Sequence, residues 1–206
     1  MTKKKIFNLA IVGLGNIGLN LYKHLTKNKK SIFEKNNVLF DVKYVSAKNK
    51  KKNRGISIPK KKWLRNYLDA SKLDDIDIVI ELIGGSDGPA KKLVFDSIRR
   101  KKHVVTANKS LISKYGDQLA LLAEKNKVNI EFEAAVAGGI PIIRTLKEGL
   151  VANKTKKIYG ILNGTSNFIL SNMEEGADFK PTLELAQKEG YAEPDPTFDI
   201  EGMDAA

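Results

Sequence analysis

The chain has 206 residues, of which 42% are hydrophobic, and it contains 36 Lys and Arg, 24 Asp and Glu, and no Cys. A chain of this length can form one packed domain of about 150 residues and part of a second, and its apolar fraction excludes disordered and fibrous proteins. The lack of Cys excludes disulfides, thiolate metal sites, iron–sulfur clusters and a cysteine nucleophile, and it fits a reducing compartment.

The formal net charge of +12 comes entirely from the N-terminal third of the chain. Residues 1–65 hold 18 basic and 2 acidic side chains, whereas residues 66–206 hold 18 basic and 22 acidic ones. Short lysine clusters at residues 3–5, 50–52 and 60–62 are typical of a solvated surface. The alternative is that they attract a phosphate-bearing ligand.

The sequence contains neither a membrane-helix pattern nor a signal peptide. No run reaches the roughly 18 to 20 consecutive apolar residues that a spanning helix needs. The apolar run that follows the basic N-terminus contains Asn8 and leads directly into a glycine-rich turn, as expected of a first strand. We therefore expect a cytoplasmic protein.

From the N-terminus onwards, strand and helix patterns alternate. Residues 6–12 form an apolar run that ends at a glycine, which is typical of a strand buried on both faces of a parallel sheet. Ile17, Leu21 and Leu25 recur at helical spacing within residues 16–27. Further strands are expected at residues 38–46, 76–83, 103–105 and 129–133, further helices at 89–101 and 110–125, and a lysine-rich loop at 48–62. This alternation predicts an α/β fold with a doubly wound parallel sheet.

The pattern changes after about Ala134, where Gly138, Gly139 and Pro141 interrupt the alternation. We therefore expect one domain at residues 1–134 and a second at 135–206. Within the second domain we expect a helical segment at residues 142–150, a strand-like segment at 157–162, helices at 167–173 and 181–189, and an acidic loop that runs to residue 206.

Residues 13–18, Gly-Leu-Gly-Asn-Ile-Gly, match the dinucleotide-binding pattern in its required context, after a strand and at the start of a helix. Gly13 would make the tight turn, Gly15 would let a pyrophosphate approach the backbone, and Gly18 would allow close packing of the helix on the strand. The phosphates would then face the free N–H groups of the helix N-terminus. The alternative is a glycine-rich connection that binds no ligand.

The segment after the second predicted strand bears on the choice between NAD and NADP. NAD-binding proteins place a carboxylate at this position to bind the ribose 2′-hydroxyl, but here Ser46 and Ala47 are followed by Lys48, Asn49 and Lys50. Lysines, with Arg54 nearby, suit a 2′-phosphate, so the sequence favours NADP. A solvated loop remains the alternative for each single lysine.

Two further groups of polar residues follow later predicted strands. Thr106 and Lys109 come after the strand at 103–105, at the edge where parallel sheets bind ligands, and Lys109 could attract a phosphate or help to transfer a proton. A lone lysine is more often a surface residue. Glu131 and Glu133 alternate with apolar residues, which is typical of a half-exposed edge strand.

Several motifs together resemble one family, homoserine dehydrogenase. The blocks occur in the family's order at residues 13–18 (GLGNIG), 106–109 (TANK), 133–141 (EAAVAGGIP), 160–167 (GILNGTSN) and 190–196 (GYAEPDP). They span nearly the whole chain. The resemblance implies a Rossmann-type sheet followed by the first part of an α+β substrate and dimerisation domain.

The resemblance also implies an activity, namely the reversible NAD(P)H-dependent reduction of L-aspartate 4-semialdehyde to L-homoserine on the way to threonine and methionine. Cofactor-binding residues implied in this way are Gly13, Gly15, Asn16, Ile17, Gly18 and Lys109, and the residue patterns described above add Lys48 and Thr106. Lys109 would lie between the nicotinamide and the substrate. Glu193 would bind the substrate's amino group, Asp199 and Asp204 would line the same pocket, and the catalytic residues would be Lys109 and Asp204.

By the same resemblance, a sodium ion would be held by Glu133 and by the backbone carbonyls of Val136, Gly138 and Ile140, an all-oxygen set that suits a hard cation. The family usually forms homodimers and acts on a small molecule, without nucleic acid or membrane partners. Its substrate domain continues beyond the residue that corresponds to Ala206. We therefore expect this chain to be a fragment with uncertain activity of its own.

Two other classes of function share features with this sequence. The phosphorylating aldehyde dehydrogenases also have a Rossmann domain and can act on aspartate semialdehyde. They need a cysteine nucleophile, however, and this chain has no Cys. A basic nucleotide-sensing or nucleic-acid-binding module would bind with strong salt dependence, and the sequence has no recognition-helix motif or aromatic platform that supports it.

Overall fold

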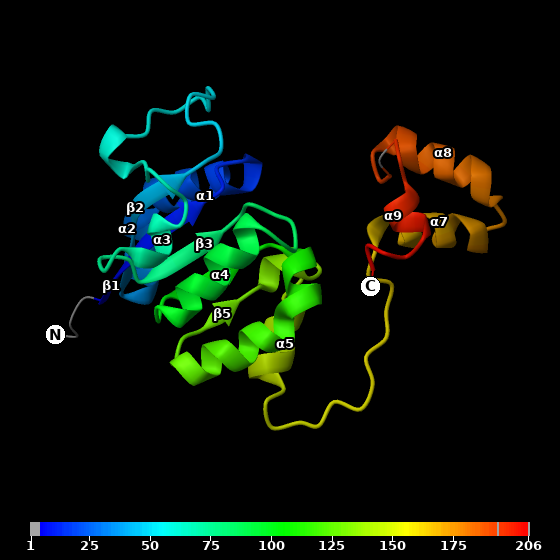
Figure 1. The fold of residues 1–206 in the computed structure, drawn as a ribbon. Helices are drawn as coiled ribbons and strands as arrows, with labels where there is room; N and C mark the ends of the chain where they lie inside the picture. Colours follow the sequence, from blue (N-terminus) through cyan, green and yellow to red (C-terminus); the bar gives the residue numbers. More distant parts are fainter. Residues whose placement is uncertain (1–4, 193, 206) are drawn as a thin grey trace. The chain divides into compact units, whose positions relative to one another are not determined.

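The computed structural model describes residues 5–192 and 194–205, which form two compact units, Met1–Gly149 (unit 1) and Leu150–Ala206 (unit 2). Figure 1 shows the elements of each unit. No helix in the described part of the chain is long and apolar enough to cross a membrane.

Unit 1 is built on a five-stranded parallel sheet with the strand order β2-β1-β3-β4-β5. Its strands are β1 (Lys5–Val12), β2 (Val38–Ser46), β3 (Ile78–Glu81), β4 (His103–Thr106) and β5 (Ile130–Glu131). The register pairs Val12 with both Ser46 and Glu81, and Glu81 with Thr106. The carboxyl ends of four strands therefore meet at one edge, and the predicted doubly wound parallel sheet is confirmed.

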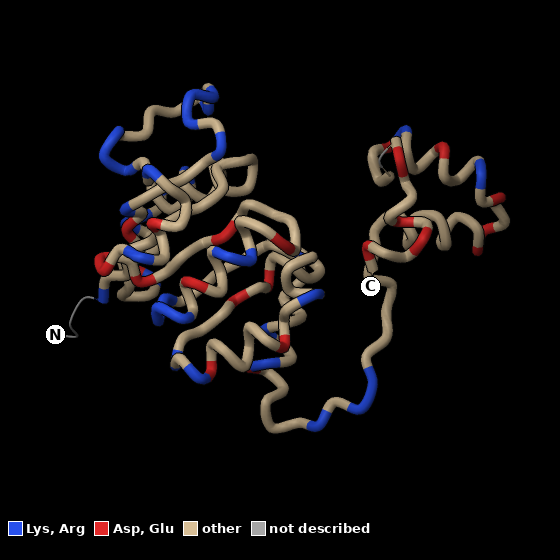
Figure 2. Tube along the Cα trace, in the orientation of Figure 1, with Lys and Arg blue, Asp and Glu red and all other residues tan. Residues whose placement is uncertain are grey.

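Helices connect consecutive strands, as a parallel sheet requires. They are α1 (Asn16–Lys27), α2 (Lys29–Asn36), the short α3 (Asp69–Lys72), α4 (Pro89–Arg99) and α5 (Lys109–Asn126), with one 3₁₀ turn at Lys60–Lys62. Helix α2 was not expected, and β5 is shorter than the five residues predicted. Figure 2 shows Lys and Arg gathered along the loop between β2 and α3, as the composition indicated.

Alternate residues of β1 are buried on opposite faces of the sheet. Leu9 and Ile11 pack with α1 and β2, whereas Ala10 and Val12 pack with the α3 and α4 side. A third buried cluster joins α4, α5, β4 and β5 around Val104. Burial on both faces explains why β1 is apolar along most of its length, and it fixes the position of the glycine turn that follows Val12.

Unit 1 ends in short irregular elements. A 3₁₀ turn at Glu133–Ala135 is followed by α6 (Ile142–Arg144) and a π turn at Thr145–Gly149. The helical segment expected at residues 142–150 therefore forms as one short helix and a wider turn. Contacts divide the chain after Gly149, and the boundary near residue 134 stays a prediction.

Unit 2 contains α7 (Gly164–Glu174), α8 (Phe179–Glu189) and α9 (Thr197–Ile200). Its core consists of Ile169, Ala186 and Ala192, with Phe168 and Leu183 packed against them. Phe168 also stacks on Tyr191, with ring centroids 4.6 Å apart. The two longer helices agree with the sequence pattern.

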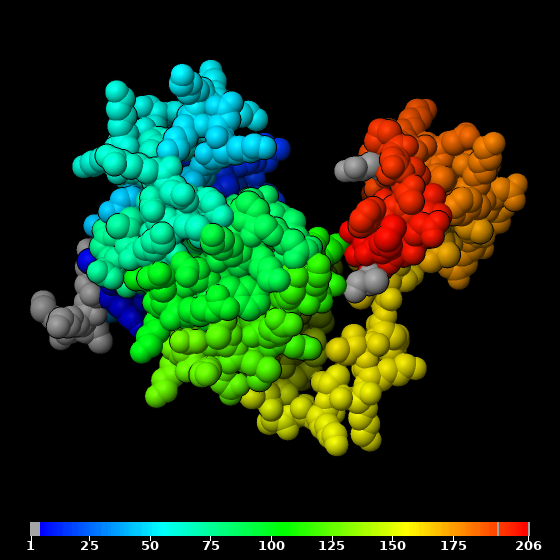
Figure 3. Space-filling model, viewed as in Figure 1, coloured from blue at the N-terminus to red at the C-terminus, as the bar shows by residue number. Residues whose placement is uncertain are grey.

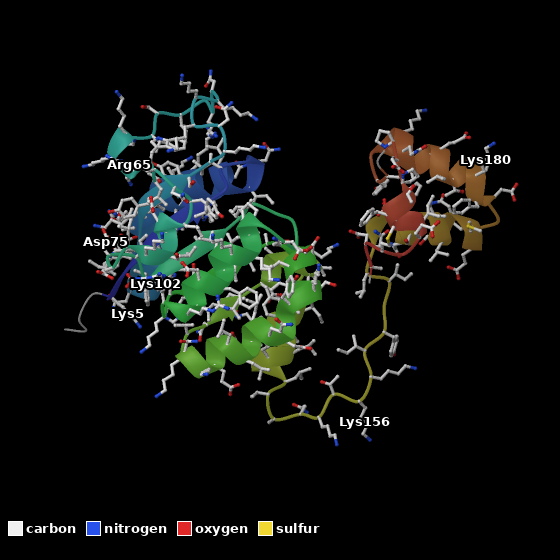
Figure 4. All side chains as sticks on the ribbon, viewed as in Figure 1. Lys5, Arg65, Asp75, Lys102, Lys156 and Lys180 are labelled. Carbon is white, nitrogen blue, oxygen red and sulfur yellow. The ribbon has the colours of Figure 1, made fainter. Side chains whose placement is uncertain are left out.

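The strand predicted at residues 157–162 was wrong, because no strand forms in the described residues 150–192 and 194–205. The segment is extended coil with Ile158, Tyr159, Ile161 and Leu162 exposed. Figure 3 shows in yellow the side chains of this stretch spread along the chain, and Figure 4 shows Lys156 pointing away from it. Its apolar pattern suits a strand, but a strand forms only where a neighbour satisfies its backbone hydrogen bonds.

Candidate functional site

The glycine pattern at residues 13–18, which covers the turn after β1 and the start of α1, admits no side chain at two of its three glycines. Gly13 has a φ of +109°, and a Cβ there would lie 2.2 Å from the backbone oxygen of Leu82. A Cβ on Gly18 would lie 1.9 Å from the backbone oxygen of Gly13. Only glycine allows α1 to pack this closely on the turn and on the chain that follows β3.

The third glycine of the pattern lies in open space. No described atom other than its chain neighbours lies within 4 Å of a Cβ built on Gly15, the residue that precedes α1. Among the described side chains none caps α1, and its first turn has no acidic residue. Asn16 and Ile17 are exposed. The N–H groups of the first helical turn are therefore directed at a space that an anion can enter.

The loop after β2 is tied to this glycine turn by a basic side chain. Arg54 donates to the backbone oxygens of Leu14 (3.2 Å), Asn49 (2.7 Å) and Lys52 (2.9 Å), and its guanidinium lies 5.5 Å from the ring centroid of Trp63. Three of its five N–H donors are thus bound to backbone carbonyls. Arg54, expected to suit a 2′-phosphate, holds the loop in place.

The lysines of the same loop differ in their surroundings. Lys50 donates to the backbone oxygen of Leu64 at 2.7 Å, whereas Lys48 is exposed just beyond the end of β2. Ser46, the last residue of β2, is buried, and its backbone oxygen accepts from the N–H of Gly13 at 2.9 Å. No carboxylate occupies the end of β2, as the sequence indicated.

The ends of β3 and β4 are joined by a ring of hydrogen bonds around Glu81, whose side chain is fully buried. Its Oε1 accepts from the N–H groups of Ile83 (2.7 Å) and Gly84 (3.1 Å), and its Oε2 accepts from the Thr106 hydroxyl at 2.6 Å. The Thr106 oxygen accepts from the N–H of Asn108 at 3.0 Å. The side-chain amide of Asn108 donates to the backbone oxygen of Gly85 at 2.8 Å, which closes the ring.

Lys109 begins α5 directly after this ring and is exposed. Asn108 caps the helix, because its Oδ1 accepts from the N–H of Leu111 at 3.1 Å. Thr106 and Lys109 were expected at this edge from the sequence, whereas Glu81 was not. The sequence does mark Glu81, because it is a single acidic residue inside an apolar run that is followed by two glycines. A charged group buried in such a strand must have hydrogen-bond partners.

The same loop has a second attachment to α5. Asp87 accepts from Lys114 Nζ at 2.7 Å, from the Tyr115 hydroxyl at 2.6 Å and from the Ser86 hydroxyl at 2.8 Å. These three hydrogen bonds, that of Lys114 first, hold the pKa of Asp87 well below its ordinary value. The stretch from Ile83 to Gly88 is therefore fixed to α5 at more than one point.

Glu133 caps the short helix α6. Its carboxylate accepts from the N–H groups of Ile143 (3.2 Å) and Arg144 (2.8 Å). Between Glu133 and α6 the chain turns sharply, with φ of +47° at Ala137 and +92° at Gly139. A carboxylate offers about four acceptor positions and a carbonyl two, so these bonds leave Glu133 capacity for a cation. An all-oxygen set of Glu133 with backbone carbonyls fits the chemistry of a sodium ion.

In unit 2, one amide side chain brings two of the predicted substrate-binding residues together. Asn163 is buried and caps α7, because its Oδ1 accepts from the N–H of Ser166 at 2.6 Å. Its Nδ2 donates to Asp199 Oδ1 at 2.7 Å and to Asp204 Oδ2 at 2.8 Å. Two carboxylates on one amide form a negative centre that suits an ammonium group.

Asn163 was missed as a positioning residue, although it lies in one of the recognised blocks, and Glu193 lies outside the described residues. A cavity of about 280 Å³ within unit 2 is lined by Asp199 and Ser166 and otherwise mostly by apolar side chains of α7, α8 and α9.

Comparison with protein families gives two consecutive matches. The model of the homoserine dehydrogenase NAD binding domain matches residues 13–133, and the model described as homoserine dehydrogenase matches residues 141–206.

Curated relatives and solved structures agree with these matches. A homoserine dehydrogenase of Neisseria gonorrhoeae is 46% identical over 202 residues, covering 98% of this chain and 46% of the relative, and one of Bacillus subtilis is 41% identical over 203 residues, covering 98% and 47%. A crystal structure of a homoserine dehydrogenase from Thiobacillus denitrificans matches with a TM-score of 0.83 and 45% identity over 98% of this chain and 46% of that one. A hyperthermophilic archaeal homoserine dehydrogenase in complex with NADPH matches with a TM-score of 0.79 and 25% identity, covering 97% and 66%. The chain spans about half the length of the curated relatives it matches.

Proposed function

The chain belongs to the homoserine dehydrogenase family, and we propose that it forms the cofactor-binding part and a portion of the substrate-binding part of such an enzyme. The activity is the reversible reduction of L-aspartate 4-semialdehyde to L-homoserine with a nicotinamide cofactor. Because the relatives are about twice as long, this activity is proposed for the protein to which these residues belong.

The cofactor is proposed to bind at the carboxyl edge of the sheet. Residues 13–18, with Gly13, Gly15 and Gly18 as its glycines, hold the pyrophosphate, and the open space at Gly15 supports this role. Lys48 binds the 2′-phosphate of NADP, in preference to NAD, since no carboxylate follows β2. When bound, the cofactor donates or accepts the hydride at the reacting carbon.

The substrate's ammonium group is proposed to be bound by Asp199, Asp204 and Glu193. Support comes from the distances between Asn163 and the first two carboxylates. Lys109 stabilises the negative charge that develops on the substrate oxygen, and it takes part in proton transfer together with Asp204. Thr106 supports cofactor binding through its bond to Glu81.

A sodium ion is proposed at the turn after β5, held by the Glu133 carboxylate and the carbonyls of Val136, Gly138 and Ile140. Its chemistry there is structural, because a hard cation with oxygen ligands fixes a turn without supplying redox chemistry. We also propose that a domain boundary lies near residue 134 and that the protein is a cytoplasmic homodimer. It is not expected to bind nucleic acid or a membrane.

The pair of carboxylates on Asn163 is the observation that carries the proposal. A glycine turn is common to many dehydrogenases, whereas a centre that suits an ammonium group restricts the class of substrate.

The test is homoserine-dependent reduction of NADP and of NAD, measured for this chain and for a form extended through the reading frame downstream in its gene. Activity with homoserine in the extended form supports the proposal. Cofactor binding without any homoserine-dependent reduction in either form contradicts it.

A further inference from the structure

The hydrogen-bond ring around Glu81 lies at the edge of the sheet where the proposed cofactor binds. Register places Glu81 beside Val12, the residue before the glycine turn, and beside Thr106 on the other side. A dinucleotide with its pyrophosphate on the glycine turn and its first nucleotide near β2 must extend its second nucleotide towards β3 and β4. The loop after β3 and the start of α5 are therefore the surfaces that meet the nicotinamide half.

Burial makes this ring rigid. Glu81 is 0% exposed, Thr106 1% and Asn108 6%. Buried polar groups that lose a partner are not rescued by water, so each member is confined to the geometry that satisfies the others. Among the described residues no buried side-chain nitrogen or oxygen lacks a hydrogen-bond partner.

The ring fixes two features at once. Glu81 binds the N–H groups of Ile83 and Gly84 and so forces the chain to turn, with φ of +84° at Gly84 and +80° at Gly85. Through Thr106 it also sets the position of Asn108, which caps α5 and directly precedes Lys109. One carboxylate thus determines where the turn lies relative to the first residue of α5.

We propose that Glu81 is a positioning residue for the nicotinamide half of the cofactor. It acts through Thr106 and Asn108 to hold the turn of Ile83–Gly85 and Lys109 in one arrangement, and it does not touch the cofactor itself. The inference rests on the proposed function, because it assumes that a nicotinamide dinucleotide binds at this edge. It goes further in assigning a role to a buried residue that contacts no ligand.

The experiment measures binding of two ligands to the 206-residue chain. NADPH carries both halves of the cofactor, whereas 2′-phospho-ADP-ribose lacks the nicotinamide. The variants are Glu81→Gln, which keeps an oxygen for the turn but offers Thr106 a donor in place of an acceptor, and Thr106→Val, which removes the hydroxyl and leaves the bonds of Glu81 to Ile83 and Gly84. Ser71→Ala is the matched control, since the Ser71 hydroxyl is also buried and donates to a carboxylate, that of Asp96, between α3 and α4.

Both test variants are expected to weaken NADPH binding about tenfold and to change the affinity for 2′-phospho-ADP-ribose less than about twofold. Ser71→Ala is expected to change neither affinity. Equal losses for the two ligands, or an unchanged NADPH affinity, would overturn the inference while leaving the proposed function intact. If Glu81→Gln does not fold, Thr106→Val decides the question. If the unmodified chain binds neither ligand, the proposed cofactor site fails and the inference fails with it.

Discussion

Alternate side chains of β1 in unit 1 are buried on both faces of a sheet, whereas the helices of unit 2 enclose a small core around Ile169, Ala186 and Ala192. The exposed side chains of unit 2 include Phe198 at 65% and Leu170 at 52%. Both units contain amphipathic helices. The difference shows that helices become well packed when a sheet lies beneath them, because a few short helices alone have too little apolar surface to bury.

The units also differ in how their proposed sites are held. The glycine turn and the Glu81 ring of unit 1 rest on buried strands, whereas the carboxylates of Asp199 and Asp204 are held by the single side chain of Asn163. Unit 1 therefore holds the residues of its proposed cofactor site in a preformed arrangement. The carboxylate pair of unit 2 depends on one residue in a weakly packed region, so substitutions there are expected to have larger structural consequences.

The largest effect is expected from Ile169→Ala in unit 2. Truncating a buried Ile or Leu to Ala costs about 2 to 5 kcal/mol, and a unit of about 60 residues has little more stability than that. We expect α7 and α8 to unfold, so that trypsin cleaves rapidly after Lys188, near the end of α8, whereas the bond after Lys180 resists trypsin because Pro181 follows it. Leu93→Ala, at a fully buried position in unit 1, is the control. It should lower the urea midpoint of unit 1 yet leave it folded, and similar behaviour of the two variants would contradict the comparison.

The next effect concerns the glycine turn. Gly18→Ala places a Cβ against the Gly13 carbonyl and should destabilise unit 1 by about 1 to 3 kcal/mol, because α1 must move. Trp63 is the only Trp in the chain and lies in unit 1, so its fluorescence during urea unfolding measures this loss. Gly15→Ala, in open space, should change stability by less than about 0.5 kcal/mol while weakening NADPH binding. Equal stability of the two variants would show that the turn is not closely packed.

How far the sequence alone predicts this structure depends on how local each interaction is. Helical periodicity and a glycine pattern are local, and they predicted α1, α4, α5 and the glycine turn after β1. The predicted strand at residues 157–162 failed because strand formation depends on a partner. An apolar pattern within one segment does not contain that information.

The two missed positioning residues show the same limit. Glu81 is defined by Thr106, which lies 25 residues away, and Asn163 by Asp199 and Asp204, which lie 36 and 41 residues away. Each is a polar residue whose role appears only when the fold brings its partners together. Glu81 left a trace in the sequence, a lone carboxylate in a buried strand, whereas the block that contains Asn163 gave no sign that this amide would hold two carboxylates.

Asn163→Ala is expected to have a smaller effect than the first two changes. It removes the cap of α7, which costs about 1 kcal/mol, and it leaves two carboxylates without their shared donor. Asn163→Ser restores a capping oxygen but reaches neither carboxylate. Hydrogen exchange in α7 should therefore accelerate in the Ala variant and recover in the Ser variant, while the carboxyl carbon resonances of Asp199 and Asp204 shift in both. Unchanged resonances would mean that the amide does not hold the pair.

The smallest effect is expected from the pH dependence of Asp87. Hydrogen bonds from Lys114, Tyr115 and Ser86 lower the pKa of Asp87 in the folded state, whereas an unfolded Asp titrates at about 3.9. Its stabilisation of unit 1 is therefore fully present above that value and is lost as the pH falls through the folded-state pKa. The difference in urea midpoint between the unmodified chain and Asp87→Asn, followed by Trp63 fluorescence, should stay constant from pH 7 to about 4.5 and narrow as the pH is lowered further. In unit 2, hydrogen bonds from the hydroxyl and N–H of Thr197 lower the pKa of Asp195. Asp195→Asn is thus the matched control, and if it changed the Trp63 transition in the same way, the two units would not unfold independently.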